Sequence, residues 1–257
     1  MGLLHFLISL LSTTIGAISG IAGGVIIKPC LDTVGNYDVA TIGMLSSITV
    51  LSMTAVSTVR FMQSRMKFEL RRAIILSIGA GIGGVLGKYL FGVFSQSMSD
   101  HRAKGIQAVL LILLLVFVLL RNYFPHGHSQ NIWKILFCGL IMGGISSFLG
   151  IGGGPINVAI ICIAFSIPVK DAAVYSLFSI FFSQLTTVGS SAISPGLDHY
   201  DLTMLSFMIP GAMIGALLGA FLNRRLTDKV IDTLFNTVMY LLIVLNTFNI
   251  YRFLIKG

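Results

Sequence analysis

Charged residues are scarce in this sequence. Asp, Glu, Lys and Arg make up only 10% of its 257 residues, whereas soluble domains carry about 25%. Such a chain cannot give a soluble globule an ordinary charged surface, which excludes a sizeable soluble domain. The 17 basic residues outnumber the nine acidic ones, but they lie mostly at the ends of apolar runs. This distribution is typical of membrane proteins and argues against a nucleic-acid partner.

Cysteine is also rare, and its placement excludes a disulfide framework and a metal-binding spacing. Cys30, Cys138 and Cys162 lie in or beside apolar runs, so we expect them to pack as small hydrophobic residues. The spacing of the other polar residues places no nucleophile beside a base. We therefore expect no metal, no cofactor and no enzymatic activity.

Long hydrophobic runs fill most of the chain instead. Hydrophobic residues account for 55% of the sequence, and the mean hydropathy is +0.94. These values predict an all-α integral membrane protein with the lipid bilayer as its surroundings. No Lys or Arg precedes the first run, so we do not expect a cleaved signal peptide. The expected segments are 3–27, 39–59, 73–95, 103–120, 132–167, 170–193, 202–222 and 230–250.

The fifth segment is broken by Gly-Ile-Gly-Gly-Gly-Pro at 150–155. In a helix each Gly costs about 1 kcal/mol and Pro about 3 kcal/mol. A break of this kind persists in a bilayer only where its backbone is buried in protein or lines a wet cavity. The free N–H groups at the start of the next half-helix would suit an anion. We expect Gly153 and Gly154 to be held at positive φ, with no side chain between this backbone and the anion.

A second copy of the motif, Gly-Ile-Ala-Gly-Gly-Val at 20–25, lies 130 residues earlier. The chain is therefore expected to be a duplication, with residues 1–122 as the first membrane repeat, 123–131 as a link and 132–257 as the second repeat. Each repeat would hold four hydrophobic segments, the first of them broken by glycine. Paired broken helices of this type build the substrate site of many secondary transporters near the membrane midplane. A dinucleotide-binding loop would need a preceding strand, which the pattern does not show.

Two glycine ladders accompany the motifs. Glycines four residues apart let helix backbones approach closely. We expect these ladders to pack inside the monomer, with the face of a homodimer as the alternative. The ladders comprise Gly79, Gly83 and Gly87 and, 132 residues later, Gly211, Gly215 and Gly219.

The loops predict how the two halves lie in the membrane. The loop at 60–72 is strongly basic, whereas its partner at 194–201 is acidic. Opposite charge in partner loops predicts inverted halves, each with three crossings and one re-entrant hairpin at the break. Gln63 and Asp198 would then lie on opposite sides. Eight simple crossings with parallel halves are the alternative.

Candidate substrate-binding residues come from the breaks and from polar helix faces beside them. The sixth segment carries hydroxyls three and four residues apart, which share one face; they either line a wet path or bond back to their own helix. Lys28 follows the first break by one turn and is either an anion partner or an interfacial lysine, the role we expect for Lys88. The candidates are Gly23, Gly24, Lys28, Ser47, Gly152, Gly153, Gly154, Asn157, Ser176, Ser179, Ser183 and Gln184.

On these motifs the chain resembles the sulfite exporter TauE/SafE family, also called the toluenesulfonate uptake permease family. The likeness includes Ala-Ala-Val-Tyr-Ser-Leu at 172–177 and the stretch 210–219, and it covers nearly the whole chain. It implies a transporter, usually an exporter, of small sulfur-containing or organic anions such as sulfite, sulfonates or sulfoacetate, in a bacterial inner membrane. Ala22 and Val25 depart from the motif, so the two half-sites are expected to differ. An anion channel and, less favoured, an intramembrane enzyme are the alternatives.

Acidic residues are missing from the middle of every apolar run. Each Asp and Glu lies at the end of a run or in a link, whereas pumps driven by protons or sodium usually keep an acid at membrane depth. We therefore expect no proton coupling through a buried carboxylate. Neutralising Asp32, Asp38 or Asp171 one at a time should leave transport above about a tenth of that of the parent.

Overall fold

Every regular element that the computed structural model describes is a helix, which confirms the all-α prediction. Seven of the described helices are long and apolar enough to cross a membrane, and α6 and α7 are shorter apolar helices. The structure describes residues 2–34, 37–62, 69–97, 99–123, 127, 131–151, 153–194 and 196–252. The elements are α1 (Gly2–Ser19), α2 (Gly24–Val34), α3 (Val39–Met62), α4 (Leu70–Gln96), α5 (Asp100–Leu119), η1 (Leu120–Tyr123), α6 (Ile132–Phe148), α7 (Pro155–Phe165), α8 (Val169–Ile193), η2 (Leu197–His199), α9 (Leu205–Arg225) and α10 (Asp228–Ile250).

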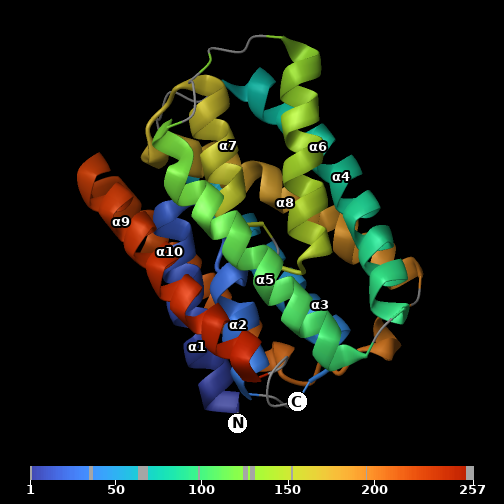
Figure 1. Cartoon of the computed structure of the whole chain (residues 1–257). Coiled ribbons are helices and arrows are strands. Elements are labelled where there is room, and N and C mark those ends of the chain that lie inside the picture. Colours follow the sequence, from blue (N-terminus) through green and yellow to red (C-terminus); the bar gives the residue numbers. More distant parts are fainter. Residues whose placement is uncertain are drawn as a thin grey trace.

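The chain reverses direction at each break. His5, near the start of α1, lies against Tyr37, just after α2, with 5.9 Å between the ring centroids. At the second break, the N–H of Gly127, before α6, donates to the carbonyl of Ile163 near the end of α7 at 2.8 Å. Figure 1 shows α1 and α2 in the lower half of the molecule and α6 and α7 in the upper half. Each broken segment is thus a helical hairpin.

Both breaks use the same local geometry. Gly20 and Gly150 follow α1 and α6 with φ values of +77° and +63°, the left-handed conformation that commonly ends a helix. Pro155 then stands at the first position of α7, where its missing N–H costs no intrahelical hydrogen bond. The similar motifs therefore produce similar turns.

The glycine ladders join the two halves. The ladder of α4 packs against α6, and the ladder of α9 packs against α1, so each ladder contacts a hairpin of the other half. A Cβ atom at any of the six positions would collide with or crowd a backbone oxygen of the facing helix. The oxygens concerned belong to Leu136, Leu140 and Gly144 on α6 and to Phe6, Leu10 and Thr14 on α1. Packing inside the monomer, as expected, is confirmed.

Gly83→Ala is expected to destabilise the fold. The new Cβ would overlap the carbonyl oxygen of Leu140, and overpacking of this kind typically costs about 1–3 kcal/mol. Gly92→Ala is the matched control in the same helix, because a Cβ there meets no atom within 4 Å. The midpoint of thermal unfolding in detergent should fall for Gly83→Ala and stay near that of the parent for Gly92→Ala. Equal midpoints would contradict close packing of α4 on α6.

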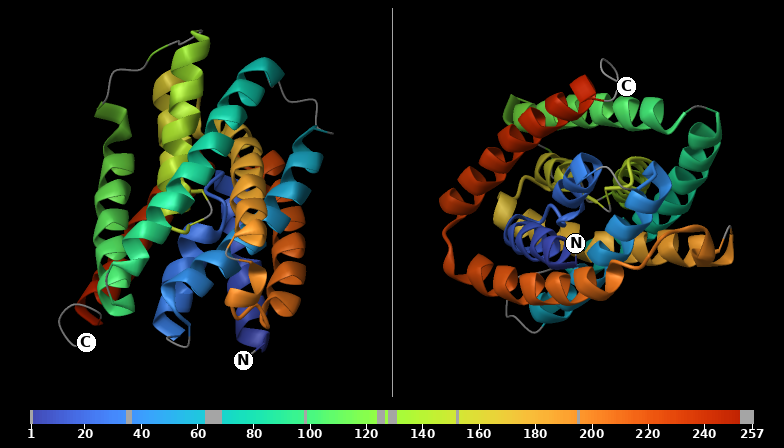
Figure 2. Two further views of the ribbon diagram at one scale, coloured as in Figure 1. Left: turned by 90° about the vertical axis from the view of Figure 1, so that its right-hand side faces the viewer. Right: turned by 90° about the horizontal axis from the view of Figure 1, so that it is seen from below.

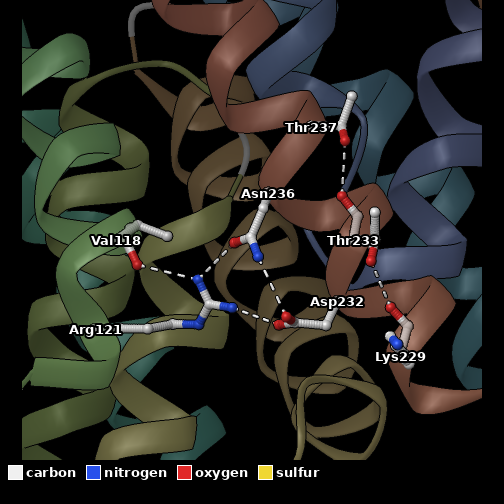
Figure 3. Close-up of polar contacts among 7 residues, drawn as sticks. All are labelled: Val118, Arg121, Lys229, Asp232, Thr233, Asn236 and Thr237. Atoms are coloured by element: carbon white, nitrogen blue, oxygen red, sulfur yellow. Dashed lines mark hydrogen bonds and ion pairs between the residues drawn. The ribbon is translucent and has the colours of Figure 1, made fainter.

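Helices α5 and α10 cross at the outside of the molecule. Figure 2 shows them on its outline when seen from below, with the two hairpins inside. At the crossing, the Arg121 side chain is 3% exposed, forms an ion pair with Asp232 and donates to Oδ1 of Asn236 at 2.9 Å (Figure 3). Its guanidinium lies 4.8 Å from the ring centroid of Phe235. This cluster fixes the end of α5 to the start of α10.

The C-terminal ends of α3 and α9 lie together at one end of the molecule, which we call the basic end. Arg224 donates to the carbonyl of Arg60 there. The phenol of Tyr175, near the start of α8, accepts a hydrogen bond from the N–H of Glu69 at the same end. From that point α8 runs on to Ile193, so Ser194 and η2, which follow it, lie at the opposite end. Gln63 lies outside the described residues.

The inverted orientation of the halves in the membrane stays a prediction. Met62 and Asp198 are exposed and lie at opposite ends of the molecule. In a variant without the three native cysteines, Met62→Cys should react with an impermeant maleimide from the cytoplasmic side only, because basic loops stay inside. Asp198→Cys should react from the outside only. Labelling of both positions from one side would contradict the prediction.

Candidate functional site

The two breaks touch each other near the centre of the fold. A Cβ atom on Gly24 would overlap the carbonyl oxygen of Ile151 and would lie 2.9 Å from Oγ of Ser46. A Cβ on Gly154 would lie 3.3 Å from Cδ1 of Ile151 and 3.8 Å from Cβ of Val25. The start of each half-helix therefore meets the break of the other half.

Helices α8 and α3 each cross one break. The Oγ of Ser176, on α8, donates to the carbonyl of Gly20 at 2.7 Å, and Ala173 of the same helix fills the space beside Gly20. At the second break the facing residue is Gly43 of α3, whose Cα would lie 3.2 Å from a Cβ on Gly150. The first break is thus filled by a side chain, whereas the second faces a residue without one.

A cavity of about 370 Å³, which we call the vestibule, leads to the second break. It is enclosed by α3, α4 and α8 and by the loop after α8, and Gly150 forms part of its wall. The loop residues that line it place its mouth at the end away from the basic end. The polar residues important for the argument are Ser47, Lys88, Ser147, Thr187 and Tyr200.

The lining of the vestibule suits a negative charge. Lys88 supplies a cation, and its Nζ donates to the carbonyl of Ser194 at 2.7 Å. Deeper in, the hydroxyls of Ser147 and Thr187 lie 2.8 Å apart. None of the described residues that line the vestibule is acidic. An anion that enters would therefore meet donors and one positive charge.

Tyr200 adds a phenol to the lining. Burial raises its pKa, nearby Asp38 raises it further, and a hydrogen bond with Ser191 lowers it. Because the net direction is upward from an ordinary value near 10, the phenol stays neutral at physiological pH. It can therefore donate a hydrogen bond at the mouth.

Backbone N–H groups are available at the second break. Within the described part of the chain, those of Gly153, Gly154 and Ile156 have no hydrogen-bond acceptor. They precede or begin α7, where the helix dipole favours negative charge. The expected positive φ holds for Gly153, at +101°, and is wrong for Gly154, whose φ of 178° is extended. A Cβ on Gly153 would overlap Ile180, so Gly153 also has a packing role.

The candidate residues predicted from the sequence fall into different places. Ser47 lines the vestibule, and Asn157 accepts a hydrogen bond from Ser146 at 3.4 Å. A Cβ on Gly23 would lie 3.0 Å from Thr13 in the first hairpin. Gly152 lies outside the described residues.

On α8, most of the hydroxyl face follows the alternative of bonding back to its own helix. The side chains of Ser183 and Gln184 are buried, and the Oγ of Ser183 and both amide atoms of Gln184 have no partner in the described structure. Thr187 both bonds back and lines the vestibule. The hydroxyls that donate to a carbonyl of α8 are those of Ser179, Thr186, Thr187 and Ser190.

Several vestibule residues were not among the candidates. Gly43, Ser147 and Tyr200 belong to three different elements, and no motif links them in the sequence. Lys88 was expected at the interface, and its place in the vestibule wall depends on the loop after α8 folding back over α4. Only the periodic small and polar residues of α3 and α8 could have signalled this cavity.

The expectation that no acidic residue is buried is wrong. Helix α2 continues to Val34, so Asp32 lies within a helix and not in a polar link. Asp32 is 6% exposed, and Lys28, one turn earlier, is 4% exposed. Both are covered by α5 and α10, which the sequence alone does not bring to this place.

Comparison with known proteins agrees with this architecture. The family model described as "Sulfite exporter TauE/SafE" matches residues 5–245. The "Probable membrane transporter protein YunE" of Bacillus subtilis (strain 168) is 27% identical over 228 residues, which cover 80% of this chain and 82% of that protein.

Proposed function

Because the chain belongs to the sulfite exporter TauE/SafE family of membrane transporters, we propose that this multi-pass membrane protein carries a small oxyanion by way of the vestibule and the second break. The observation that supports this most is the position of the vestibule. It leads from one end of the molecule to Gly150 and is lined by hydroxyls and Lys88, with no acidic residue among its described lining.

The chemistry of a sulfonate or sulfite fits these groups. An anion that leaves water loses its hydration and needs several donors to replace it. The vestibule offers the hydroxyls of Ser47 and Ser147, and the second break offers the N–H groups of Gly153 and Gly154, which have no acceptor in the described structure. A group with three oxygens around one centre can accept from several of these donors at once. The substrate class that we propose is therefore small sulfur-containing or organic anions.

The direction of access follows from charge. Basic loops stay in the cytoplasm, so the basic end, with Arg60 and Arg224, would face inward. The vestibule then opens to the outside of a bacterial inner membrane, and the contact of Gly24 with Ile151 helps to close the inner side. An inside-negative potential favours exit of an anion by about 2.3 kcal/mol per charge per 100 mV. This supports export.

The purified protein should be stabilised against heat by its substrate. A ligand at 100 times its dissociation constant adds about 2.7 kcal/mol to the stability of the folded state. We expect sulfite, methanesulfonate or sulfoacetate to raise the unfolding midpoint, and sodium, choline and sucrose to leave it unchanged. Selective stabilisation by a cation or by the neutral solute would contradict the proposal.

A further inference from the structure

A buried polar cluster lies beside the second break and outside the vestibule. It comprises Lys28 and Asp32 of α2, Gln107 of α5 and Asn246 of α10, each no more than 6% exposed. These residues line a narrow space whose wall also includes Ile151 of the second break. Helices α2, α5 and α10 meet in the lower part of Figure 1. We call this group the α2 cluster.

The α2 cluster contains unmatched hydrogen-bonding groups. Within the described structure, Nζ of Lys28, Oδ1 of Asp32 and Oε1 of Gln107 have no partner. Lys28 and Asp32 are four residues apart on one helix face, yet they form no ion pair within 4.0 Å. The Gln107 amide nitrogen is already used, since it donates to the carbonyl of Phe148 at 3.0 Å.

The neighbouring charged groups in the described structure do not supply the missing partners of Lys28 and Asp32. On α5, Lys104 pairs with Asp100 at 2.9 Å and donates to the carbonyl of Tyr37. After α10, Arg252 donates to the carbonyl of Thr33. Other titratable groups described on this side are His5 of α1, which lies against Tyr37, Cys30 of α2, and Asp38, which accepts from the N–H of Thr41.

The size of the space in the α2 cluster limits which ligand can bind there. Each unpaired charge buried in a protein costs several kcal/mol, so the α2 cluster is stabilised by whatever compensates it. This narrow space has no room for a water molecule, so a hydrated cation or an oxyanion does not fit in it. A proton needs no such volume. From this geometry we propose that Asp32 and Lys28 form a proton-binding site that is coupled to the anion at the second break.

The coupling follows from charge. With Asp32 ionised and Lys28 protonated, the α2 cluster is neutral; a proton taken from solvent by the carboxylate gives it a charge of +1 close to Ile151. That charge attracts an anion bound at the second break, and the anion in turn favours the proton, because coupling between two sites is reciprocal. Proton and anion should therefore bind together and move in the same direction. A monovalent anion then crosses without net charge, so the gradients of anion and proton set its direction, and the membrane potential alone does not. This inference rests on the proposed function.

Asp32→Asn tests the site, with Asp38→Asn as the matched control, because Asp38 is an exposed carboxylate just before α3. The probes are methanesulfonate and sulfate, whose charges are constant between about pH 5 and pH 8, measured by thermal shift. In the parent and in Asp38→Asn, the apparent dissociation constant should rise by up to about tenfold per pH unit as one proton is lost. In Asp32→Asn it should stay near the acid value of the parent at every pH.

Proton movement gives a second measurement on the unmodified protein. Addition of either anion in weak buffer near pH 7 should raise the pH of the solution as the protein takes up protons, and Asp32→Asn should give no such change. Proteoliposomes with a trapped pH dye should show protons moving with the anion in the parent only. Anion binding without proton uptake by the parent, or with unchanged pH dependence in Asp32→Asn, would overturn the proton site alone. Failure of every anion to bind the parent would overturn the proposed function and the coupling with it.

Discussion

Asp232→Ala should be strongly destabilising. The substitution leaves the Arg121 guanidinium, on a side chain only 3% exposed, without its ion pair. Removal of one partner of a buried ion pair costs about 3–5 kcal/mol, and we expect the lower end because the Asp232 side chain is 44% exposed. The remaining hydrogen bond to Asn236 and the ring of Phe235 do not neutralise the charge. The expected result is a lower unfolding midpoint and separation of α10 from the end of α5.

Two further variants make this prediction specific. Asp228→Ala is the control in the same helix, because Asp228 is more exposed and lies 4.0 Å from Lys170; an exposed pair contributes about 0–1 kcal/mol. The double variant Arg121→Met with Asp232→Ala should recover much of the loss, since it removes the stranded charge as well. Equal midpoints for Asp232→Ala and Asp228→Ala would show that the pair contributes nothing to stability.

The helices could be predicted from the sequence because their signals are local. Apolar runs predicted segments at 39–59 and 73–95, and the structure has α3 and α4 at Val39–Met62 and Leu70–Gln96. The glycine motifs predicted both breaks for the same reason, because the residues that form each turn lie within the motif itself. The ladder spacing even indicated close helix packing, although it could not name the facing helix.

The vestibule and the α2 cluster could not be predicted because they depend on tertiary packing. In the sequence Asp32 stands in a polar link after the first apolar run, and only the coverage by α5 and α10 makes it buried. Lys88 stands at the end of the glycine ladder, and only the loop after α8 makes it part of a cavity. Neither the burial of Asp32 nor the place of Lys88 in the cavity wall produces a periodic pattern in the sequence around that residue.

A one-residue difference between the halves accounts for the asymmetry of the site. Gly43 and Ala173 are 130 residues apart, as are Gly20 and Gly150, and they occupy the same place opposite the breaks. The Ala173 side chain fills the first break, whereas Gly43 leaves the second break open toward the vestibule. Ala22, which stands where the second motif has glycine, lies in the same break as Gly20. Its φ of +50° shows that this turn forms without a glycine at that position.

Gly92→Phe should reduce transport at least tenfold while leaving the fold intact. Gly92 lines the vestibule, and a Cβ there meets no atom within 4 Å. The Cβ of a new side chain is therefore accommodated, and we expect the phenyl ring to lie in the vestibule. It would occupy much of a cavity of about 370 Å³ and place an apolar surface between the mouth and the second break. The anion would lose both its path and its hydration.

Gly189→Phe is the matched control. Gly189 is exposed on α8, a Cβ there also meets no atom within 4 Å, and it does not line the vestibule. In proteoliposomes loaded with the anion that stabilises the parent, efflux should fall at least tenfold for Gly92→Phe, which corresponds to about 1.4 kcal/mol or more in the barrier. Efflux for Gly189→Phe should stay within twofold of the parent, and the unfolding midpoints of the two variants should agree. Undiminished efflux through folded Gly92→Phe would show that the anion does not pass through the vestibule, and the proposed path would be wrong.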